Sequence, residues 1–413
     1  MLNVKKNIFE IISKNSQEIE NWFVEKYQEK SPPFYSSVDI RYSGFKIAPV
    51  DTNLFPAGFN LLTEKQKNNA SFQAKNYFEK YFSNAKTILL IAENHTRNKF
   101  YLENVFSIKN ILEQAGMEVF TSKFEFLEDE KELETASGNK IFYHKIQREN
   151  NQIFILLENN QKIIPDVILV NNDMSSGAPE ILVNLIQPVF PPIGLGWYQR
   201  KKTKHFASYN LVARQFAEKF NFDPWLISSA FTKCEKINFR EKEGLECVAY
   251  NASELLKKIQ IKYDEYNIPE KPYLFVKANS GTYGMGIMVL KEPSDILEIN
   301  KKERHSLDKI KEGVENTEVI IQEGIPTIDT YDGKTAEPLV YLVNGNAVGC
   351  SYRINSNQDK FGNLNSKGME FHSFDRDCSS DVNKNPLEKE ASMDCPVQAL
   401  IARLASCAST SEV

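Results

Sequence analysis

The chain has 413 residues, of which 41% are hydrophobic and 25% are charged, and this balance excludes an intrinsically disordered protein. The length allows two or three domains, each with a hydrophobic core of its own. Because 50 basic and 55 acidic residues leave a formal net charge of −5, the charge favours neither nucleic acid nor an anionic membrane as a partner.

The first 62 residues are expected to form a helix followed by a β-hairpin. Apolar residues recur at helical spacing until Pro32 and Pro33, which is not the pattern of a secretory signal peptide. Two short strand patterns, 38–42 and 45–50, then meet at Ser43 and Gly44. No apolar run reaches the roughly 18 residues of a membrane span. We therefore expect a cytoplasmic protein without a membrane partner.

Residues 63–205 have the pattern of a parallel α/β domain. The expected helices and strands alternate over residues 62–82, 87–92, 98–114, 118–121 and 166–170. Polar loops at 93–97 and 171–176 follow two of these strands. Ligands in open α/β sheets gather beyond the carboxyl ends of strands, so we interpret the loops as walls of a substrate site. Loops of this polarity are more often simply solvated.

A basic run of Arg200, Lys201, Lys202 and Lys204 is the one local departure from mixed charge. It is either the solvated start of a helix or an anion-binding rim. The six cysteines form no CxxC pair and have no accompanying histidine spacing, which argues against a zinc site and against a disulfide framework. We expect these cysteines to be reduced.

The segment 273–290, YLFVKANSGTYGMGIMVL, predicts a phosphate-binding site. A buried strand pattern ends at Lys277, a glycine-rich loop follows, and a second strand pattern resumes at Ile287. Glycines let backbone N–H groups approach phosphate oxygens, and Lys277 adds a positive charge. The loop returns into a strand, so it is neither a P-loop nor a dinucleotide fingerprint, both of which open onto a helix. The alternative is an ordinary hairpin with a lysine at its edge.

Beyond the glycine-rich loop the pattern becomes mostly antiparallel. Residues 318–322 form an apolar strand, and 337–343 pairs with 347–354 across Asn344 and Gly345, a strong two-residue turn signal. Residues 356–390 are polar and irregular, and a short helix over about 396–407 follows.

These features occur in an order that resembles an ATP-grasp ligase. The order is Lys277 with its glycine-rich loop, the strand VIIQEGIPTI, the hairpin EPLVYLVNGNAVGCSYRIN, and the segment GNLNSKG at 362–368. The resemblance implies ATP and Mg²⁺ as cofactors, with Lys277 and Arg353 as the catalytic residues. It also implies a nucleotide-binding set, which is Lys277, Ser280, Gly281, Thr282, Tyr283, Gly284, Gly286, Gln322, Glu323, Ile325, Glu337 and Asn365.

The metal ligands of such an enzyme are missing from their usual place after Asn365. An acidic residue on one strand and an acid-x-Asn triplet on the next occur instead in the N-terminal hairpin, as Asp39 and as Asp51 with Asn53. Antiparallel pairing would bring Asp39 close to Asp51, and oxygen ligands suit Mg²⁺. The alternative is that both acids lie on the surface of a hairpin.

We infer an α/β protein with an ATP-grasp fold that is circularly permuted, its nucleotide domain having an α+β pattern. Residues 1–62 would complete the nucleotide domain at 206–413, and residues 63–205 would form the substrate domain.

The closest resemblance is to the proteobacterial ATP-grasp-type glutamate-cysteine ligases. It rests on the strings DIRYSGFKIAPVDTNLFPAGFN, NNDMSSGAP, GWYQRKKTKHF, VKANSGTYGMGIM and EPLVYLVNG. The resemblance implies that ATP activates the γ-carboxylate of L-glutamate as an acyl phosphate. The amine of L-cysteine then displaces phosphate and gives γ-glutamylcysteine, the first step of glutathione biosynthesis.

The amino-acid-binding residues are less well marked. The candidates are charged or polar residues in loops and hairpins, namely Arg41, Lys46, Asn60, Arg97 and Arg200. Another ATP-grasp ligase, such as a glutathione synthetase, remains an alternative, as does a nucleotide-binding regulatory protein without turnover. The expected partners are the small-molecule substrates, and the oligomeric state is open, a homo-oligomer included.

Overall fold

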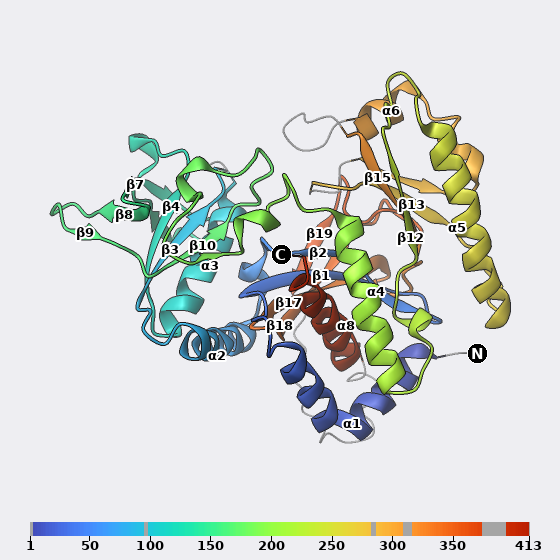
Figure 1. The fold of residues 1–413 in the computed structure, drawn as a ribbon, viewed down its shortest axis with the longest axis horizontal. Helices are drawn as coiled ribbons and strands as arrows, with labels where there is room; N and C mark the ends of the chain where they lie inside the picture. Colours follow the sequence, from blue (N-terminus) through green and yellow to red (C-terminus); the bar gives the residue numbers. More distant parts are fainter. Residues whose placement is uncertain (1–2, 95–97, 282–285, 309–315, 374–393, 413) are drawn as a thin grey trace.

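The computed structural model describes residues 3–94, 98–281, 286–308, 316–373 and 394–412. Three larger sheets, each with its own helices, form a left, a central and a right part of the molecule as viewed in Figure 1. In the described part of the chain, no helix is both long and apolar enough to cross a membrane.

The central sheet joins segments from the two ends of the chain. Its strand order is β19-β18-β17-β1-β2, and every neighbouring pair is antiparallel. Its strands are β1 (Tyr35–Tyr42), β2 (Ile47–Asn53), β17 (Lys334–Val343), β18 (Asn346–Ile354) and β19 (Glu370–Ser373), with β16 (Thr330–Tyr331) pairing with β17. The N-terminal hairpin therefore lies directly beside β17.

Both hairpins of the central sheet confirm the sequence prediction. Asn344 and Gly345 have φ values of 54° and 69°, as the two-residue turn between β17 and β18 requires. One prediction was wrong, because β19 interrupts the segment 356–390 that was expected to be irregular. This edge strand is held by backbone pairing to β18 and has no buried side chain, so its sequence carries no apolar alternation.

Helices cover the central sheet. One of them is α8 (Asp394–Ser409), against which α1 (Val4–Lys26) and α4 (Lys202–Lys219) pack in turn. α8 contacts α1, α4 and strands β1, β2, β17 and β18. It presents Val397, Leu400, Ile401 and Leu404 to the core at helical spacing, and all four are buried.

The left part of Figure 1 contains a parallel sheet with the order β11-β10-β3-β4. Its strands are β3 (Thr87–Ala92), β4 (Glu118–Lys123), β10 (Val167–Asn171) and β11 (Val189–Phe190), and its helices are α2 (Glu64–Tyr81) and α3 (Lys99–Gln114). Thr63 and Gln66 form a capping box at the start of α2, and Asn98 caps α3.

Short strands between β4 and β10 were not predicted. They are β5 (Glu132–Glu134), β6 (Lys140–Phe142), β7 (Ile146–Glu149), β8 (Gln152–Leu156) and β9 (Lys162–Ile163). They form two small antiparallel sheets, and few of their side chains are buried, so the sequence pattern is weak.

The right part contains an antiparallel sheet with the order β12-β15-β13-β14. Its elements are β12 (Phe231–Glu235), β13 (Leu274–Ala278), β14 (Ile287–Leu290), β15 (Glu318–Glu323), α5 (Leu245–Glu265) and α6 (Lys301–Asp308). Side chains alternate between the two faces of a strand, so Leu274 and Val276 pack toward α5 while Phe275 and Lys277 face the opposite way.

Short 3₁₀ helices complete the described chain. They are η1 (Phe59–Leu61), η2 (Glu128–Glu130), η3 (Glu180–Leu182), η4 (Ile193–Leu195), η5 (Pro224–Leu226) and η6 (Pro293–Ile296). The whole is a mixed α/β protein in which the parallel sheet lies within residues 63–205, where the sequence predicted it.

Candidate active site

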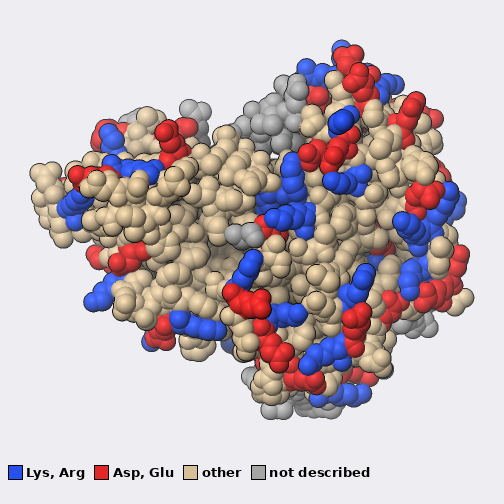
Figure 2. All heavy atoms as spheres, viewed as in Figure 1, with Lys and Arg blue, Asp and Glu red and all other residues tan. Residues whose placement is uncertain are grey.

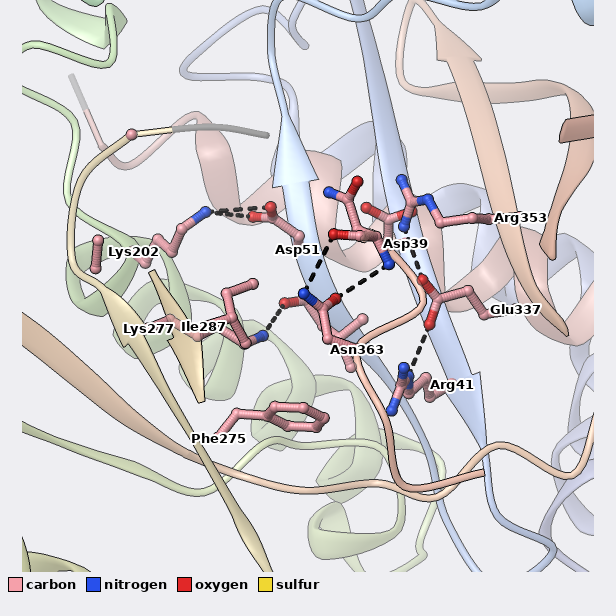
Figure 3. Close-up of a pocket in the computed structure, with 14 residues that line it drawn as sticks. Asp39, Arg41, Asp51, Lys202, Phe275, Lys277, Ile287, Glu337, Arg353 and Asn363 are labelled. Carbon is pink, nitrogen blue, oxygen red and sulfur yellow. Dashed lines mark hydrogen bonds and ion pairs between the residues drawn. The ribbon is translucent and has the colours of Figure 1, made fainter. Parts of the chain in front are cut away.

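A pocket lies between the central and right-hand sheets (Figure 3). Most of its lining residues are polar or charged. The lining residues are Asp39, Arg41, Val50, Asp51, Lys202, Phe275, Lys277, Ala278, Gly281, Ile287, Glu337, Arg353, Asn363 and Asn365. Figure 2 shows Lys and Arg side chains gathered near the middle of the face, where α4 begins between the left and right parts.

A row of alternating charges forms one wall of the pocket. Nε of Arg41 lies 2.7 Å from Oε2 of Glu337, and Oε1 of Glu337 accepts a 2.7 Å hydrogen bond from Nη1 of Arg353. The same Nη1 lies 2.7 Å from Oδ1 of Asp39. Figure 3 shows the four side chains pointing toward one another from β1, β17 and β18. The hairpin thus contributes an acid beside Arg353, although their strands are not adjacent.

The two acids of this row differ in pKa. Burial raises the pKa of Asp39 to about 6, and the charges of Glu337 and Asp51 add to the rise while Arg353 opposes it. Burial also raises the pKa of Glu337, but Arg41 and Arg353 outweigh it and hold that pKa below the usual range. Carboxylates as close together as those of Asp39, Glu337 and Asp51 favour the binding of an additional cation.

A second cluster faces the first across the pocket. Asp39 and Asp51 are paired residues of β1 and β2, as the sequence predicted. Nζ of Lys202, at the start of α4, lies 2.9 Å from Oδ1 and 3.1 Å from Oδ2 of Asp51. Burial tends to raise the pKa of Asp51, but Lys202 and Lys277 outweigh it and lower the pKa to about 2. Asp51 is therefore ionised and already neutralised by an ammonium group.

Lys277 projects from β13 into the same space. Its Nζ donates to the carbonyl oxygen of Val50 at 3.1 Å and to Oε1 of Gln322 at 2.9 Å. Burial lowers the pKa of Lys277 to about 8, against the charge of Asp51, which raises it. Among the described residues the side chain is held by neutral oxygens and makes no direct ion pair, which leaves its charge available for an anion.

The glycine-rich loop is described only at its ends. Gly281 and Gly286 have φ values of 94° and 64°, which explains glycine at both positions. Gly281 lines the pocket and Ser280 precedes it. The predicted nucleotide residues Thr282, Tyr283 and Gly284, and the predicted substrate residue Arg97, lie outside the described residues.

Two asparagines close the pocket beyond β18. Asn363 and Asn365 both line it, and Oδ1 of Asn363 accepts a hydrogen bond from the backbone N–H of Asn365 at 3.1 Å. The segment 362–365 is held beside the pocket in part by a hydrogen bond, in which Nη2 of Arg41 donates to the carbonyl oxygen of Gly362 at 2.7 Å.

The strand with the predicted nucleotide-binding residues Gln322 and Glu323 is present as β15, but these two side chains bind to other parts of the protein. Nε2 of Gln322 donates to Oγ of Ser229 at 2.8 Å, and Oε2 of Glu323 accepts from Nζ of Lys46 at 2.7 Å. Ile325 is buried. None of the three predicted residues Gln322, Glu323 and Ile325 lines the pocket described above.

Three predicted amino-acid-binding residues are also placed away from the pocket wall. Lys46 is fully buried against Glu323 and the ring of Trp225, and Asn60 lies in η1. Arg200 is buried, with Nε and Nη2 on the carboxylate of Glu412 at 2.7 and 2.9 Å and Nη1 on the carbonyl oxygen of Thr52 at 2.6 Å. Arg41 is the described member of this set that reaches the pocket.

The predicted metal ligand Asn53 is turned toward its own chain. Its Oδ1 accepts from the backbone N–H of Phe55 at 2.9 Å, and its Nδ2 donates to the carbonyl oxygen of Phe55 at 3.2 Å. It does not line the pocket. Among the residues that the structure describes, no group of three or more His, Cys, Asp and Glu side chains is arranged as a metal site.

Sequence reasoning missed the role of Lys202 in this pocket. The basic run that contains Lys202 suggested an anion-binding rim, but nothing in the sequence separates it from its neighbours. Lys201 pairs with Glu318, and Lys204 contacts the carbonyl oxygen of Glu412, while Lys202 points at Asp51. Phe275 was not predicted to line the pocket, because the sequence of an apolar strand does not show which of its two faces lies toward a site.

Comparisons with known proteins agree on one family. The family model for GshA, glutamate-cysteine ligase, matches residues 10–413. The crystal structure of "Putative gamma-glutamylcysteine synthetase" from Methylobacillus flagellatus KT is 38% identical with a TM-score of 0.88, covering 98% of this chain and 95% of that one. A search of the curated proteins found no match.

The structure of a glutathione synthetase-like effector from Globodera pallida is more distant, with 11% identity and a TM-score of 0.38 over 90% of this chain and 80% of that one. The family match spans the hairpin, the pocket and α8 together, and the Methylobacillus structure shares the fold over nearly the whole length. The chain belongs to the glutamate-cysteine ligase family.

Proposed function

We propose that the pocket between the central and right-hand sheets is the site where this glutamate-cysteine ligase binds ATP and Mg²⁺. One observation carries the proposal: Lys277 of β13, Glu337 of β17, Arg353 of β18 and two acids of the N-terminal hairpin converge on one pocket. An anion with an accompanying divalent cation matches this mixture of cations and acids.

The cations of the pocket would hold the phosphates. Lys277 and Lys202 approach from the side of Phe275 and α4, and Arg353 approaches from the opposite wall. The planar guanidinium of Arg353 can bind two oxygens of a transferring phosphoryl group at once, which a point charge cannot do. Backbone N–H groups next to Gly281 would add neutral donors.

The acids fit Mg²⁺. Asp39 and Asp51 offer carboxylate oxygens from paired positions, and their mutual repulsion contributes to the raised pKa of Asp39. Lys202 at 2.9 Å from Asp51 occupies the place of a counter-ion. Mg²⁺ usually takes one or two carboxylates and completes its shell with phosphate oxygens and water, so two protein ligands are sufficient. When bound, Mg²⁺ neutralises the charge that develops on the phosphates.

The ligation needs positioning and charge more than a protein nucleophile. Transfer of the γ-phosphoryl group of ATP to the γ-carboxylate of glutamate gives an acyl phosphate and ADP. The amine of cysteine then attacks the acyl carbon and phosphate leaves. Lys277 and Arg353 would stabilise the negative charge of the transferring group.

The arrangement supports a circularly permuted ATP-grasp domain. β1 pairs directly with β17, and α8 packs on β1, β2, β17 and β18, so segments from both ends of the chain share one sheet. On this proposal residues 1–62 and 206–413 form the nucleotide domain, and residues 63–205 form the substrate domain.

Arg41 is the predicted substrate residue that we retain for the glutamate carboxylate, because its guanidinium reaches the pocket. Lys46 and Arg200 are also held in buried ion pairs but, unlike Arg41, they do not line the pocket.

An ADP-release assay tests the function directly. The purified chain is incubated with ATP, Mg²⁺ and single amino acids or pairs, and we expect release only with glutamate plus cysteine. Release with γ-glutamylcysteine plus glycine would instead identify a glutathione synthetase, which no present observation favours. No release with any pair would indicate a nucleotide-binding protein without turnover.

Lys277→Ala in the same assay tests the site. Lys334→Ala is the matched control, because Lys334 is half-exposed at the start of β17 and its ion pair with Glu370 is long, at 3.8 Å. We expect Lys277→Ala to lose ligation while Lys334→Ala retains it. Equal activity of the two variants would remove Lys277 from the proposed site.

A further inference from the structure

Two cysteines of the right-hand part lie in direct contact. Sγ of Cys234, in β12, is 3.2 Å from Sγ of Cys247, in the first turn of α5. Asn251, one helical turn later, places its Nδ2 3.2 Å from the first sulfur and 3.3 Å from the second. The amide is fixed in turn by a 3.0 Å hydrogen bond to the carbonyl oxygen of Cys247.

The two thiols differ in access to solvent. Cys234 is buried and belongs to the core, whereas Cys247 is exposed. A pair of sulfurs that served only packing would be expected to be buried together, as cysteine then behaves as a small apolar side chain. Cys350, Cys395 and Cys407 are buried. An exposed thiol backed by a buried one is the arrangement of an attacking and a resolving cysteine.

We propose that Cys234 and Cys247 form a dithiol site that is reversibly oxidised to a disulfide by small disulfides. The Cys247 thiolate attacks one sulfur of a disulfide RSSR, forms a mixed disulfide with R, and releases RS⁻. The Cys234 thiol then attacks the Cys247 sulfur, and its proton leaves with the second R group as RSH. Two protein thiols are oxidised and one RSSR is reduced to two thiols.

Formation of the disulfide requires only a small movement of the two sulfurs. A disulfide bond is about 2.05 Å long, so the sulfurs must approach by roughly 1.2 Å from their present contact. Burial, together with the hydrogen bond between Cys234 and Cys247, raises the pKa of Cys234 to about 12. Cys234 is therefore protonated at neutral pH, which leaves the exposed Cys247 as the first to react.

The bond would link β12 to α5 on the face of the sheet opposite the proposed ATP pocket. Cys234 pairs with Val319 of β15, and both belong to the core that packs against α5. Phe275 and Lys277 project from the other face. We therefore expect oxidation to raise thermal stability, by roughly 2–5 °C, and to leave ATP binding unchanged.

Peptide mapping tests the proposal on the full chain. Trypsin cuts after Lys233, Lys236, Lys242 and Lys257, so Cys234 falls in peptide 234–236 and Cys247 in peptide 243–257. The reduced protein is incubated with 2-hydroxyethyl disulfide, and free thiols are then alkylated. We expect a single linked pair of these two peptides, which dithiothreitol separates again.

Three variants make the result specific. Cys247→Ser should abolish the linked peptides and the rise in melting temperature, whereas Cys350→Ser should preserve both. Asn251→Leu should slow formation of the link at least several-fold, because the amide no longer holds the sulfurs together.

A mixed disulfide that persists on Cys247, a link from Cys247 to another cysteine, or no oxidation of Cys247 at all would each overturn the proposal. A folded wild-type melting curve before oxidation ensures that the link is measured in the native state.

Discussion

At the scale of single residues, the candidate site is a set of charges whose protonation is set by burial and by close partners. Lys277 is the clearest case, since it is buried yet held only by the oxygens of Val50 and Gln322. Arg353 differs because two acids contact it. Burial lowers its pKa, but the charges of Asp39 and Glu337 outweigh burial and raise the pKa above its ordinary value. One cation can therefore lose its proton in an accessible pH range and the other cannot.

Lys277 should make ATP binding weaken at alkaline pH. Its pKa is lowered to about 8, so the ammonium is present below that pH and is lost as pH rises through it. If only the charged form binds phosphate, the Kd of ATP should rise about tenfold between pH 7 and pH 9. The measurement is titration calorimetry with Mg²⁺ present and no amino acid, which avoids the titration of the substrate amines.

Lys277→Arg is the control for this pH dependence. A guanidinium remains charged throughout the range, so this variant should bind ATP with a Kd that does not change between pH 7 and pH 9. A flat profile for the unaltered chain, or the same slope in Lys277→Arg, would show that another group controls binding.

Arg353→Lys should lower kcat about a hundredfold. The substitution keeps one positive charge but loses the fork that can contact two oxygens as charge develops. Arg403→Lys is the matched control, because Arg403 makes a bidentate pair with Glu20 on α1, outside the pocket. Steady-state kinetics of both variants at saturating substrates decide the matter, and a near-normal kcat for Arg353→Lys would assign Arg353 a structural role.

At the scale of elements, the turn that follows α8 is attached to the start of α4 by one buried carboxylate. Glu412 binds the guanidinium of Arg200 through both oxygens and contacts Nδ1 of His205 at 2.7 Å. Arg200 in turn donates to the carbonyl oxygen of Thr52, next to Asp51. The C-terminal turn therefore fixes the strand that carries a proposed metal ligand.

Glu412→Gln should lower the free energy of unfolding by about 3 kcal/mol, because it leaves the buried guanidinium of Arg200 without its counter-charge. Glu20→Gln is the control: its bond to Arg403 has similar geometry, but Glu20 is half-exposed, so the loss should stay below about 1 kcal/mol. Urea unfolding at pH 7 measures both. A loss for Glu412→Gln no larger than that for Glu20→Gln would contradict this account of the turn.

The contribution of Glu412 to the free energy of unfolding depends on pH. Burial tends to raise the pKa of Glu412, but Arg200 and His205 outweigh it, so the folded-state pKa lies below the unfolded one. The stabilisation is therefore present above the usual glutamate range and is lost as pH falls below it. The difference in the free energy of unfolding between Glu412→Gln and the unaltered chain should therefore become smaller in acid.

The sequence predicted elements with local signals and missed contacts without them. The turn at Asn344 and Gly345, the hairpin pairing of Asp39 with Asp51, and the strands around the glycine-rich loop all follow from residue type and spacing. The bond of Lys202 to Asp51 spans 151 residues and that of Arg200 to Glu412 spans 212. Nothing local marks either partner, because a lysine in a basic run has the same pattern whether it is solvated or paired.

At the scale of the whole molecule, the site exists only because distant segments share one sheet. β1 lies between β2 and β17, and α8 packs against both the hairpin and the strands of the second half. The displaced acid-x-Asn triplet indicated that the N-terminal hairpin lies beside the second half of the chain, and the permutation proposed from it stays a prediction. The side-chain engagement of Asn53 with Phe55 could not be predicted, since it depends on the turn after β2.

The Mg²⁺ dependence of ATP binding in Asp51→Asn tests the central claim most directly. Asp51 lies some 200 residues before Lys277 in sequence but lines the same pocket. The variant loses one oxygen charge from a hard-cation site and should raise the Mg²⁺ concentration needed for half-maximal ATP binding by about tenfold or more. Asp332→Asn, in the exposed turn between β16 and β17, is the matched control and should leave that concentration unchanged. An unchanged Mg²⁺ requirement in a folded Asp51→Asn protein would contradict the permuted metal site.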